Sequence, residues 1–254
     1  MLRLLAREAD VSLESILELP ELSGVFKYSA IIGSRDSAQF RDQFQQYLEF
    51  GFTDFKIKIF GDTGTDYANR KNLLDNGTPD LTVRADANSI WSSAGAAIEY
   101  FKNLDYPFVA IEEPLKKGQF SDCKIIAESL GIPVILDESF TRVADFNDIS
   151  ADPASWIANL RISKMGGILR SLEIAEMAKQ NGVSIILGAQ VGESSILTRM
   201  ALVVANMYRN SVIAQEGAFG SRLLTRDLVD PPIEFGAGGI LKAEDIYDLI
   251  RPVG

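Results

Sequence analysis

The stretch of sequence that decides the fold is TDFKIKIFGD, Thr53–Asp62. Its side chains alternate as those of a β-strand do, so Lys56 and Lys58 point to the same face. Short strand-like runs recur at nearly constant spacing. Six of their predicted ends are Lys58, Asp86, Glu112, Asp137, Arg161 and Gly188, which are 28, 26, 25, 24 and 27 residues apart. So regular a period favours a repeated structural unit.

Strand and helix patterns alternate along the chain. Eight predicted strands are rich in β-branched and aromatic residues: KYSAII (from Lys27), FKIKIF (Phe55), LTVRAD (Leu81), FVAIE (Phe108), PVILD (Pro133), WIANLRI (Trp156), VSIILG (Val183) and SVIAQ (Ser211). Helical patterns lie between them at DSAQFRDQFQQYLEFG (Asp36), SAGAAIEYFKNL (Ser93), ILRSLEIAEMAKQNG (Ile168) and SSILTRMALVVANMY (Ser194). This alternation predicts an α/β protein with a closed TIM-type (β/α)8 barrel, ahead of an open doubly wound sheet.

Composition limits the classes of partner and compartment. The chain has 254 residues, of which 46% are hydrophobic and 24% charged, enough for one large folded domain. A net charge of −10 makes nucleic acid an unexpected partner. The first residues, MLRLLAREADVSLESILEL, are amphipathic and interrupted by charge, and no apolar run is long enough to span a bilayer. We therefore expect a cytoplasmic protein without a membrane partner.

Two residue counts restrict the chemistry. The sequence has no histidine and a single cysteine, Cys123. An intrachain disulfide, a thiolate-rich metal site, a histidine-dependent triad and a histidine general base are therefore all excluded. Acid–base chemistry must come from Lys, Asp, Glu, Tyr, Arg or the lone Cys123.

Polar residues gather at the predicted carboxyl ends of the strands, where active sites of these barrels lie. They are Lys56 and Lys58, Asp86 and Asn88, Glu112 and Glu113, Asp137 and Glu138, and Arg161 and Lys164. Carboxylates on three consecutive strands would repel one another unless a cation lay between them. A hard, oxygen-binding ion suits them, so Mg²⁺ is expected first and Mn²⁺ second.

The paired lysines suggest a general base. Two ammonium groups on one face lower each other's pKa, and a nearby divalent cation lowers it further, so one lysine could accept a proton near pH 7. A metal that binds a substrate carboxylate would stabilise the enediolate formed when the α-proton leaves. We therefore expect abstraction of the proton α to a carboxylate of a small substrate.

The motifs KIK (56–58), DAN (86–88), EEP (112–114), DES (137–139) and KMGG (164–167) together resemble the barrel of the enolase superfamily, muconate-lactonizing-enzyme subgroup. A lysine or histidine base working with Mg²⁺ is a known property of that superfamily. The resemblance covers about residue 27 to the C-terminus and implies a modified (β/α)7β barrel. It also implies that residues 1–24 are a remnant helix of a capping domain and that residues 25–254 form the catalytic barrel with a C-terminal tail.

The resemblance assigns roles to individual residues. It implies that Lys58 is the base and that Lys56 tunes it and helps to hold the substrate carboxylate. The implied magnesium ligands are Asp86, Glu112 and Asp137. The segment GAQVGESS, from Gly188 to Ser195, matches a family loop, which implies that Glu193 and Ser194 lie near the substrate, as does Asn88 in DAN.

Two departures from the family pattern affect the expected reaction. Arg161 stands where the subgroup usually carries a second catalytic lysine, and Lys164 follows three residues later. Because arginine stays protonated, a one-base β-elimination or cycloisomerisation, with Arg161 as a fixed cation, is expected ahead of epimerisation. The resemblance also implies that the capping domain is largely missing, and an uncovered barrel mouth would favour association into a homo-oligomer.

Other interpretations of the same residues remain open. A non-catalytic barrel retained for binding or assembly would explain the missing capping domain. An aldolase with a Schiff-base lysine would leave the three carboxylates unexplained. Among single residues, Glu113 is expected in a solvated loop, and Asp137 or Ser139 could cap a helix. Arg84, which shares a strand face with Asp86, is expected to form an ion pair inside the barrel.

Overall fold

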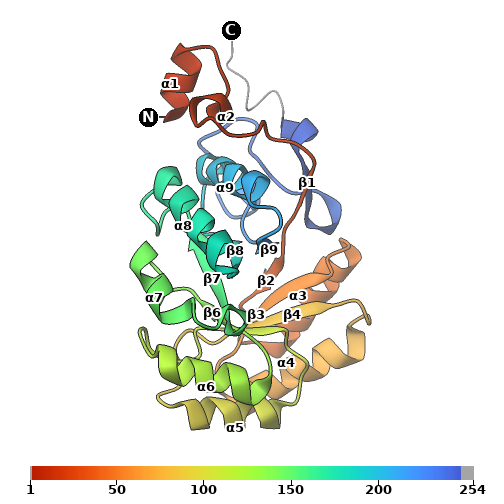
Figure 1. Cartoon of the computed structure of the whole chain (residues 1–254). Coiled ribbons are helices and arrows are strands. Elements are labelled where there is room, and N and C mark those ends of the chain that lie inside the picture. The colour runs from red at the N-terminus through yellow and green to blue at the C-terminus, as the bar shows by residue number, and fades with distance from the viewer. Residues whose placement is uncertain (1, 247–254) are drawn as a thin grey trace.

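Eight parallel strands form the framework of the protein (Figure 1). The computed structural model describes residues 2–246. The strands pair in sequence order and are β2 (Ala30–Ile32), β3 (Asp54–Lys58), β4 (Thr82–Asp86), β5 (Ala110–Glu112), β6 (Val134–Leu136), β7 (Trp156–Arg161), β8 (Ser184–Gly188) and β9 (Val212–Gln215). The first and last are joined by a backbone hydrogen bond of 2.8 Å from Ser29 N to Gln215 O. All eight predicted strands and the parallel barrel are confirmed.

Helices follow most of the strands and cover the outside of the sheet. They are α3 (Ser37–Glu49), α4 (Thr63–Asn76), α5 (Ala94–Leu104), α6 (Phe120–Leu130), α7 (Phe146–Ile149), α8 (Ile168–Asn181) and α9 (Ser195–Met207). Side-chain caps begin several of them: Asp36 Oδ1 accepts a 2.8 Å hydrogen bond from Gln39 N at the start of α3. No described helix is long and apolar enough to cross a membrane.

Besides the four-residue α7, two of these helices, α4 and α6, were not predicted from the sequence. Helix α4 buries Asp66 and Asn69 together with a single large apolar residue, Leu73, so it has no clear apolar stripe. Helix α6 buries Cys123, Ile126 and Ala127 but begins without a side-chain cap. The usual sequence signals of periodicity and capping were therefore weak in both.

The N-terminal region also differs from the prediction of one remnant helix. It contains two shorter helices, α1 (Leu2–Glu8) and α2 (Leu13–Ile16). Strand β1 (Val25–Lys27) then pairs antiparallel with β10 (Ile240–Lys242) from the tail. This ribbon needs a glycine at Gly239, where φ is +71° and a Cβ would lie 2.4 Å from Tyr28 O. Short 3-10 turns occupy Val143–Asp145, Pro153–Ser155, Gly220–Arg222, Ala237–Gly239 and Ala243–Ile246.

The two faces of the barrel strands have different chemistry. Outward side chains such as Phe55 pack on the helices, with the Phe55 ring centroid 5.0 Å from that of Phe44 in α3. Inside the barrel a small apolar cluster contains Ala110, Ile135, Ile157 and Ile186. Buried polar and charged side chains, among them Lys56, Arg84, Glu112 and Asn159, also lie on the barrel strands.

Candidate active site

The carboxyl ends of β3, β4 and β5 bring three predicted site residues side by side. In the strand register Lys58 is opposite Asp86, and Asp86 is opposite Glu112. The side chains of Lys58 and Asp86 are half-buried and Glu112 is fully buried. Parallel pairing therefore produces the juxtaposition that the strand-end pattern predicts.

Lys56 is a buried ammonium held by two carboxylates. Its Nζ lies 2.8 Å from Glu216 Oε2 and 3.1 Å from Glu112 Oε2. Burial alone would lower the pKa of Lys56, but the charges of Glu216 and Glu112 outweigh it and raise the pKa above its ordinary value. Lys56 is thus a permanent cation, and the expected mutual lowering of the two lysine pKa values does not apply to it.

Lys58 differs from Lys56 in its partners. Within the described residues its side chain makes no hydrogen bond and no ion pair. It is half-buried at the end of β3, two residues beyond Lys56 and on the same face of the strand. Of the two lysines, Lys58 is the one whose nitrogen is available to a substrate.

The carboxylates of Asp86 and Glu112 interact electrostatically. Burial, and then the charge of Glu112, raises the pKa of Asp86 to about 7. Burial would also raise the pKa of Glu112, but Lys56 outweighs it and lowers the pKa. The second oxygen of Glu112 accepts a 2.9 Å hydrogen bond from Asn159 Nδ2. Asp86 is therefore a carboxylate that lacks a cation of its own.

Asp137 is held on the other side of the mouth by two cations. Lys164 Nζ lies 2.7 Å from Asp137 Oδ1 and donates to two backbone oxygens, those of Asp137 and Asn159. Arg161 forms an ion pair with Asp137 Oδ2. Burial, and then the charge of Arg161, lowers the pKa of Lys164 to about 7.

These contacts bear on the predicted metal site. The three carboxylates suit a hard cation chemically, and the like-charged pair Asp86 and Glu112 is the arrangement that a divalent ion would stabilise. Among residues 2–246, however, no three or more Asp, Glu, His or Cys side chains form a group placed to hold a metal ion. The predicted convergence of all three is not what the structure has, because Asp137 is paired with Arg161 and Lys164. Their roles as ligands stay a prediction.

The prediction that Glu113 lies in a solvated loop is wrong. Its carboxylate is buried and accepts hydrogen bonds from Asp137 N (2.7 Å), Ser139 N (2.6 Å) and Ser139 Oγ (3.0 Å). Burial raises the pKa of Glu113 to about 7. Glu113 thus fixes the backbone that carries Asp137, and Ser139 serves this contact rather than a helix cap.

The three predicted substrate-binding residues lie around the mouth. Asn88 is exposed, and its backbone N–H donates to Asp86 Oδ1 over 3.2 Å. Glu193 is half-buried and accepts a 2.7 Å hydrogen bond from Gln190 N, and burial raises its pKa. Ser194 is the N-cap residue of α9. Their contacts with a substrate stay a prediction.

Two residues of the site were missed from the sequence. Glu216 directly follows the strand SVIAQ, so the strand-end rule used for the other carboxylates would have found it. Asn159 lies inside β7, where the alternation of faces directs it into the barrel with Arg161. Together they complete the surroundings of Lys56 and Glu112.

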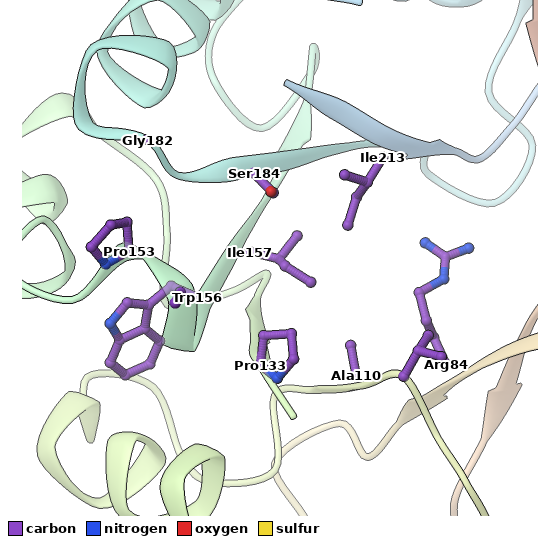
Figure 2. Close-up of a pocket in the computed structure, with 11 residues that line it drawn as sticks. Arg84, Ala110, Pro133, Pro153, Trp156, Ile157, Gly182, Ser184 and Ile213 are labelled. Carbon is purple, nitrogen blue, oxygen red and sulfur yellow. The ribbon is translucent and has the colours of Figure 1, made fainter. Parts of the chain in front are cut away.

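The opposite end of the barrel is built differently. A cavity of about 260 Å³ lies there. Figure 2 shows residues that line it, most of them apolar, such as Pro133, Trp156 and Ile157. Arg84 borders it and donates to Asp54 Oδ1 (2.7 Å) and Ser29 Oγ (2.5 Å), which confirms the predicted ion pair inside the barrel. Reactive side chains are therefore concentrated at the mouth.

Comparison with known proteins identifies the family. The family described as Enolase C-terminal domain-like matches residues 39–245, which include every predicted site residue. The chain belongs to the enolase superfamily. The predicted resemblance to its mandelate racemase and muconate-lactonizing-enzyme branch is confirmed, because a racemase and a cycloisomerase are among the relatives.

Two curated relatives of this enolase-superfamily barrel illustrate the range of reactions. An L-amino acid-D/L-Glu epimerase of Francisella philomiragia is 30% identical over 190 residues, 74% of this chain and 53% of the relative. An o-succinylbenzoate synthase of Listeria innocua is 27% identical over 200 residues, 76% of this chain and 50% of the relative. The chain spans about half the length of these curated relatives.

A solved structure supports the fold of this enolase-superfamily barrel. A dipeptide epimerase of Cytophaga hutchinsonii, complexed with Mg and the dipeptide D-Ala-L-Val, matches with a TM-score of 0.82. The match covers 94% of this chain and 64% of the epimerase at 23% identity. At that identity the likeness shows a shared fold.

Proposed function

We propose that the barrel mouth removes the proton α to the carboxylate of a small substrate and that Lys58 is the base. The observation that carries this proposal is the contrast between the two lysines of β3. Lys56 is held by Glu112 and Glu216, whereas Lys58 has no partner in the described part of the chain. An unpaired amine next to a fixed cation suits proton abstraction beside a carboxylate.

The neighbouring residues have distinct parts in this proposal. Lys56, a permanent cation, offsets part of the negative charge of Glu112 and Glu216 near the end of β3 and so lowers the repulsion that a substrate carboxylate meets there. Arg161 remains protonated on the opposite side of the mouth, so it stabilises negative charge instead of accepting a proton. Glu113 holds the backbone N–H groups of Asp137 and Ser139 and so keeps the end of β6 in place.

Asp86, Glu112 and Asp137 would hold a magnesium ion, with manganese as a possible substitute. Support comes from the like-charged pair Asp86 and Glu112 and from the Mg bound to the dipeptide epimerase of Cytophaga hutchinsonii. When bound, the ion would stabilise the negative charge of an enediolate. Asp137 would have to exchange part of its contact with Arg161 and Lys164 for the ion.

The reaction that follows proton removal is proposed to be a β-elimination, as in o-succinylbenzoate synthesis, or an isomerisation. Arg161 favours elimination or cycloisomerisation with one base over epimerisation with two. The curated relatives include an o-succinylbenzoate synthase, a chloromuconate cycloisomerase and several epimerases, so each outcome has a precedent in the superfamily.

Deuterium exchange tests the base. The purified chain is incubated in D2O with Mg²⁺ and a panel of N-acylamino acids, dipeptides and cyclic carboxylates, and loss of the α-proton signal is followed by NMR. We expect Lys58→Met to lower the exchange rate at least 100-fold, because general base catalysis typically contributes about 10² to 10⁴. Lys102→Met, an exposed lysine of α5, is the matched control and should exchange normally. Equal exchange in Lys58→Met would refute the role.

Calorimetric titration with Mg²⁺ and Mn²⁺ tests the metal site. Saturable binding to one site is expected, at least tenfold weaker in Asp86→Asn and Asp137→Asn, because each substitution removes a charged oxygen ligand. Asp75→Asn, on the exposed face of α4, should bind as the unchanged chain does. Binding that none of the site variants alters would place the ion elsewhere.

A second candidate is a barrel retained for binding without catalysis. The observation that favours it is the pairing of Asp137 with Arg161 and Lys164, which occupies a predicted metal ligand. A folded chain that neither binds Mg²⁺ nor exchanges any α-proton would support this alternative over the enzyme.

A further inference from the structure

The cavity at the amino-terminal end of the barrel has no part in the proposed proton chemistry. We call it the amino-end cavity; its volume is about 260 Å³, and it is bordered by Arg84 of β4 and by residues at or just before the starts of β5 to β9. A cavity of about 150 Å³ with apolar walls is enough to bind benzene in another protein. The amino-end cavity is therefore large enough for a substituted six-membered ring.

Small side chains at this end of the barrel explain why the cavity exists. Bulky branched residues usually fill each layer of a barrel interior. Here Ile157 has Ser184 as its register partner on β8 and shares the interior apolar cluster with Ala110. The cavity is open to solvent at an apolar rim, because Val109 is 43% exposed and Ile213 is 51% exposed. A ligand can therefore enter from this end and bury apolar surface against Ile157.

Arg84 brings hydrogen-bond donors to the amino-end cavity. Its side chain is 2% exposed, and Nη2 donates to Asp54 Oδ1 over 2.7 Å and to Ser29 Oγ over 2.5 Å. Nε and Nη1 make no hydrogen bond with any described residue. Buried N–H groups in proteins nearly always have an acceptor, because leaving one without a partner is unfavourable. The free donors of Arg84 therefore indicate a ligand that carries an acceptor.

The charges around Arg84 favour a neutral acceptor over an anion. Asp54 Oδ1 lies 2.7 Å from Nη2, and Glu216 Oε1 lies 3.7 Å from Nη1, so two carboxylates already compensate the guanidinium. They would repel a third carboxylate, whereas a carbonyl oxygen accepts hydrogen bonds without adding charge. The hydroxyl of Ser184, which makes no hydrogen bond within the described residues, is a second donor. In the view of Figure 2, Arg84 and Ser184 border the cavity on either side of Ile157.

We propose that the amino-end cavity is a second ligand site of this protein and that it binds a small neutral ring compound with one carbonyl group. The carbonyl oxygen accepts a hydrogen bond from Arg84, and the ring packs on Ala110, Pro133 and Ile157. The lysines of the barrel mouth take no part in this binding, so the proposal stands or falls independently of the proposed function.

Three compounds of nearly the same shape test the chemical class of the ligand. The probe is 4-fluoroacetophenone, a ketone on a six-membered ring. In 4-fluoro-α-methylstyrene a methylene group replaces the carbonyl oxygen, and in 4-fluorobenzoate a carboxylate replaces the ketone. Fluorine NMR line widths, measured over a range of ligand concentrations, give the three dissociation constants. The ketone should bind saturably to one site, and the benzoate at least tenfold more weakly, because of its repulsion by Asp54 and Glu216.

Arg84→Lys tests the donor. It keeps a positive charge beside Asp54 and Glu216 but removes Nε and Nη1. The preference for the ketone, expressed as the ratio of the styrene and ketone dissociation constants, should fall at least tenfold in this variant, because a hydrogen bond from a charged donor typically contributes about that much to an equilibrium constant. Transfer of the ring from water contributes equally in the two chains, so it cancels in the comparison.

Ser184→Leu tests the location. The larger side chain occupies the cavity beside Ile157, so ketone binding should be lost. Ser211 is also a half-buried serine, just before β9 and outside the cavity lining, so Ser211→Leu is the matched control and should bind as the parent chain does. Thermal unfolding midpoints check that each variant is folded.

Several results would overturn the proposal. One is the absence of saturable ketone binding to the parent chain, and another is benzoate that binds as tightly as the ketone. These two results need no variant, so they decide the matter even if a substitution prevents folding. A ketone preference that Arg84→Lys leaves unchanged would also contradict the proposal. Ketone binding that is lost in Lys58→Met but kept in Ser184→Leu would place the compound at the barrel mouth instead.

Discussion

At the scale of single residues, Glu216 is the centre of the charged barrel interior. Its Oε2 binds Lys56 Nζ at 2.8 Å, and its Oε1 lies 3.7 Å from Arg84 NH1. All three side chains are at least nine-tenths buried, so each charge depends on the others for compensation. This network runs from the interior of the barrel to the mouth and holds Lys56 in its protonated form.

Removing Glu216 should therefore be costly. We expect Glu216→Ala to lower the free energy of unfolding by about 1–3 kcal/mol, because it takes one partner from two buried cations and leaves Lys56 with Glu112 and Arg84 with Asp54. Urea denaturation measures this. Asp75→Ala, which removes an exposed ion pair with Lys71 on α4, should cause a much smaller change. Similar effects in the two variants would contradict the interior network.

At the scale of secondary structure, the start of α9 depends on a residue far along the chain. Ser194 is the N-cap residue, but its side chain makes no cap hydrogen bond. Asp227 supplies the missing acceptor: its Oδ2 accepts from Ser195 N at 2.9 Å and from Ser195 Oγ at 2.8 Å. The cap of this helix is thus a tertiary contact with the segment of chain that follows β9.

We predict that Asp227→Ala lowers the free energy of unfolding by about 1–2 kcal/mol, the usual cost of a lost helix cap. Burial alone would raise the pKa of Asp227, but hydrogen bonds from Ser195 outweigh it and hold the pKa below its ordinary value. The folded state therefore binds this proton less readily than the unfolded state, and stability falls as the pH falls. The contribution should be complete above about pH 4 and lost as the pH drops through the folded pKa.

Unfolding of the parent chain and of Asp227→Asn, measured from pH 7 to pH 2, checks this dependence. The difference in stability between the two should shrink only in the acidic part of the range. A difference that stays constant to pH 2 would mean that Asp227 acts without its charge.

At the scale of the whole molecule, a buried ion pair joins the N-terminal helices to the barrel. Glu14 Oε2 in α2 lies 2.6 Å from Arg199 NH2 in α9, and both side chains are buried. Figure 1 shows α2 near α9, with α1 beside α2. A charge left alone in such a place is unfavourable, so this pair makes attachment of the N-terminal segment cooperative with the barrel.

The pair can be tested by comparing single and double variants. Glu14→Leu and Arg199→Leu should each lower the free energy of unfolding by about 3–5 kcal/mol, because each leaves one unpaired buried charge. The double variant should recover much of that loss, since leucines can pack where the ion pair was. Chemical denaturation gives the three values. Losses that simply add in the double variant would show that the two residues do not interact.

The sequence predicted the repeat of strands and the polar positions at their ends. Short apolar runs and their regular spacing can be read from residues close together in the sequence. It could not predict α4, whose buried residues include Asp66 and Asn69, because that helix has no clear apolar stripe. Nor could it predict that Glu113 is buried, since the donors that satisfy it, Asp137 N and Ser139 N, come from the segment directly after the next strand.

By itself, the sequence determined the barrel, the absence of histidine chemistry and the set of strand-end side chains from which an active site could be made. Only the tertiary structure decided which cation pairs with which carboxylate. In the folded chain Lys56 pairs with Glu112 and Glu216. Asp137 pairs with Arg161 and Lys164. Lys58 has no partner in the described part of the chain. The reason is physical. A buried charge is stabilised by opposite charges within a few ångströms of it, and residues far apart in sequence become such neighbours only when the barrel closes.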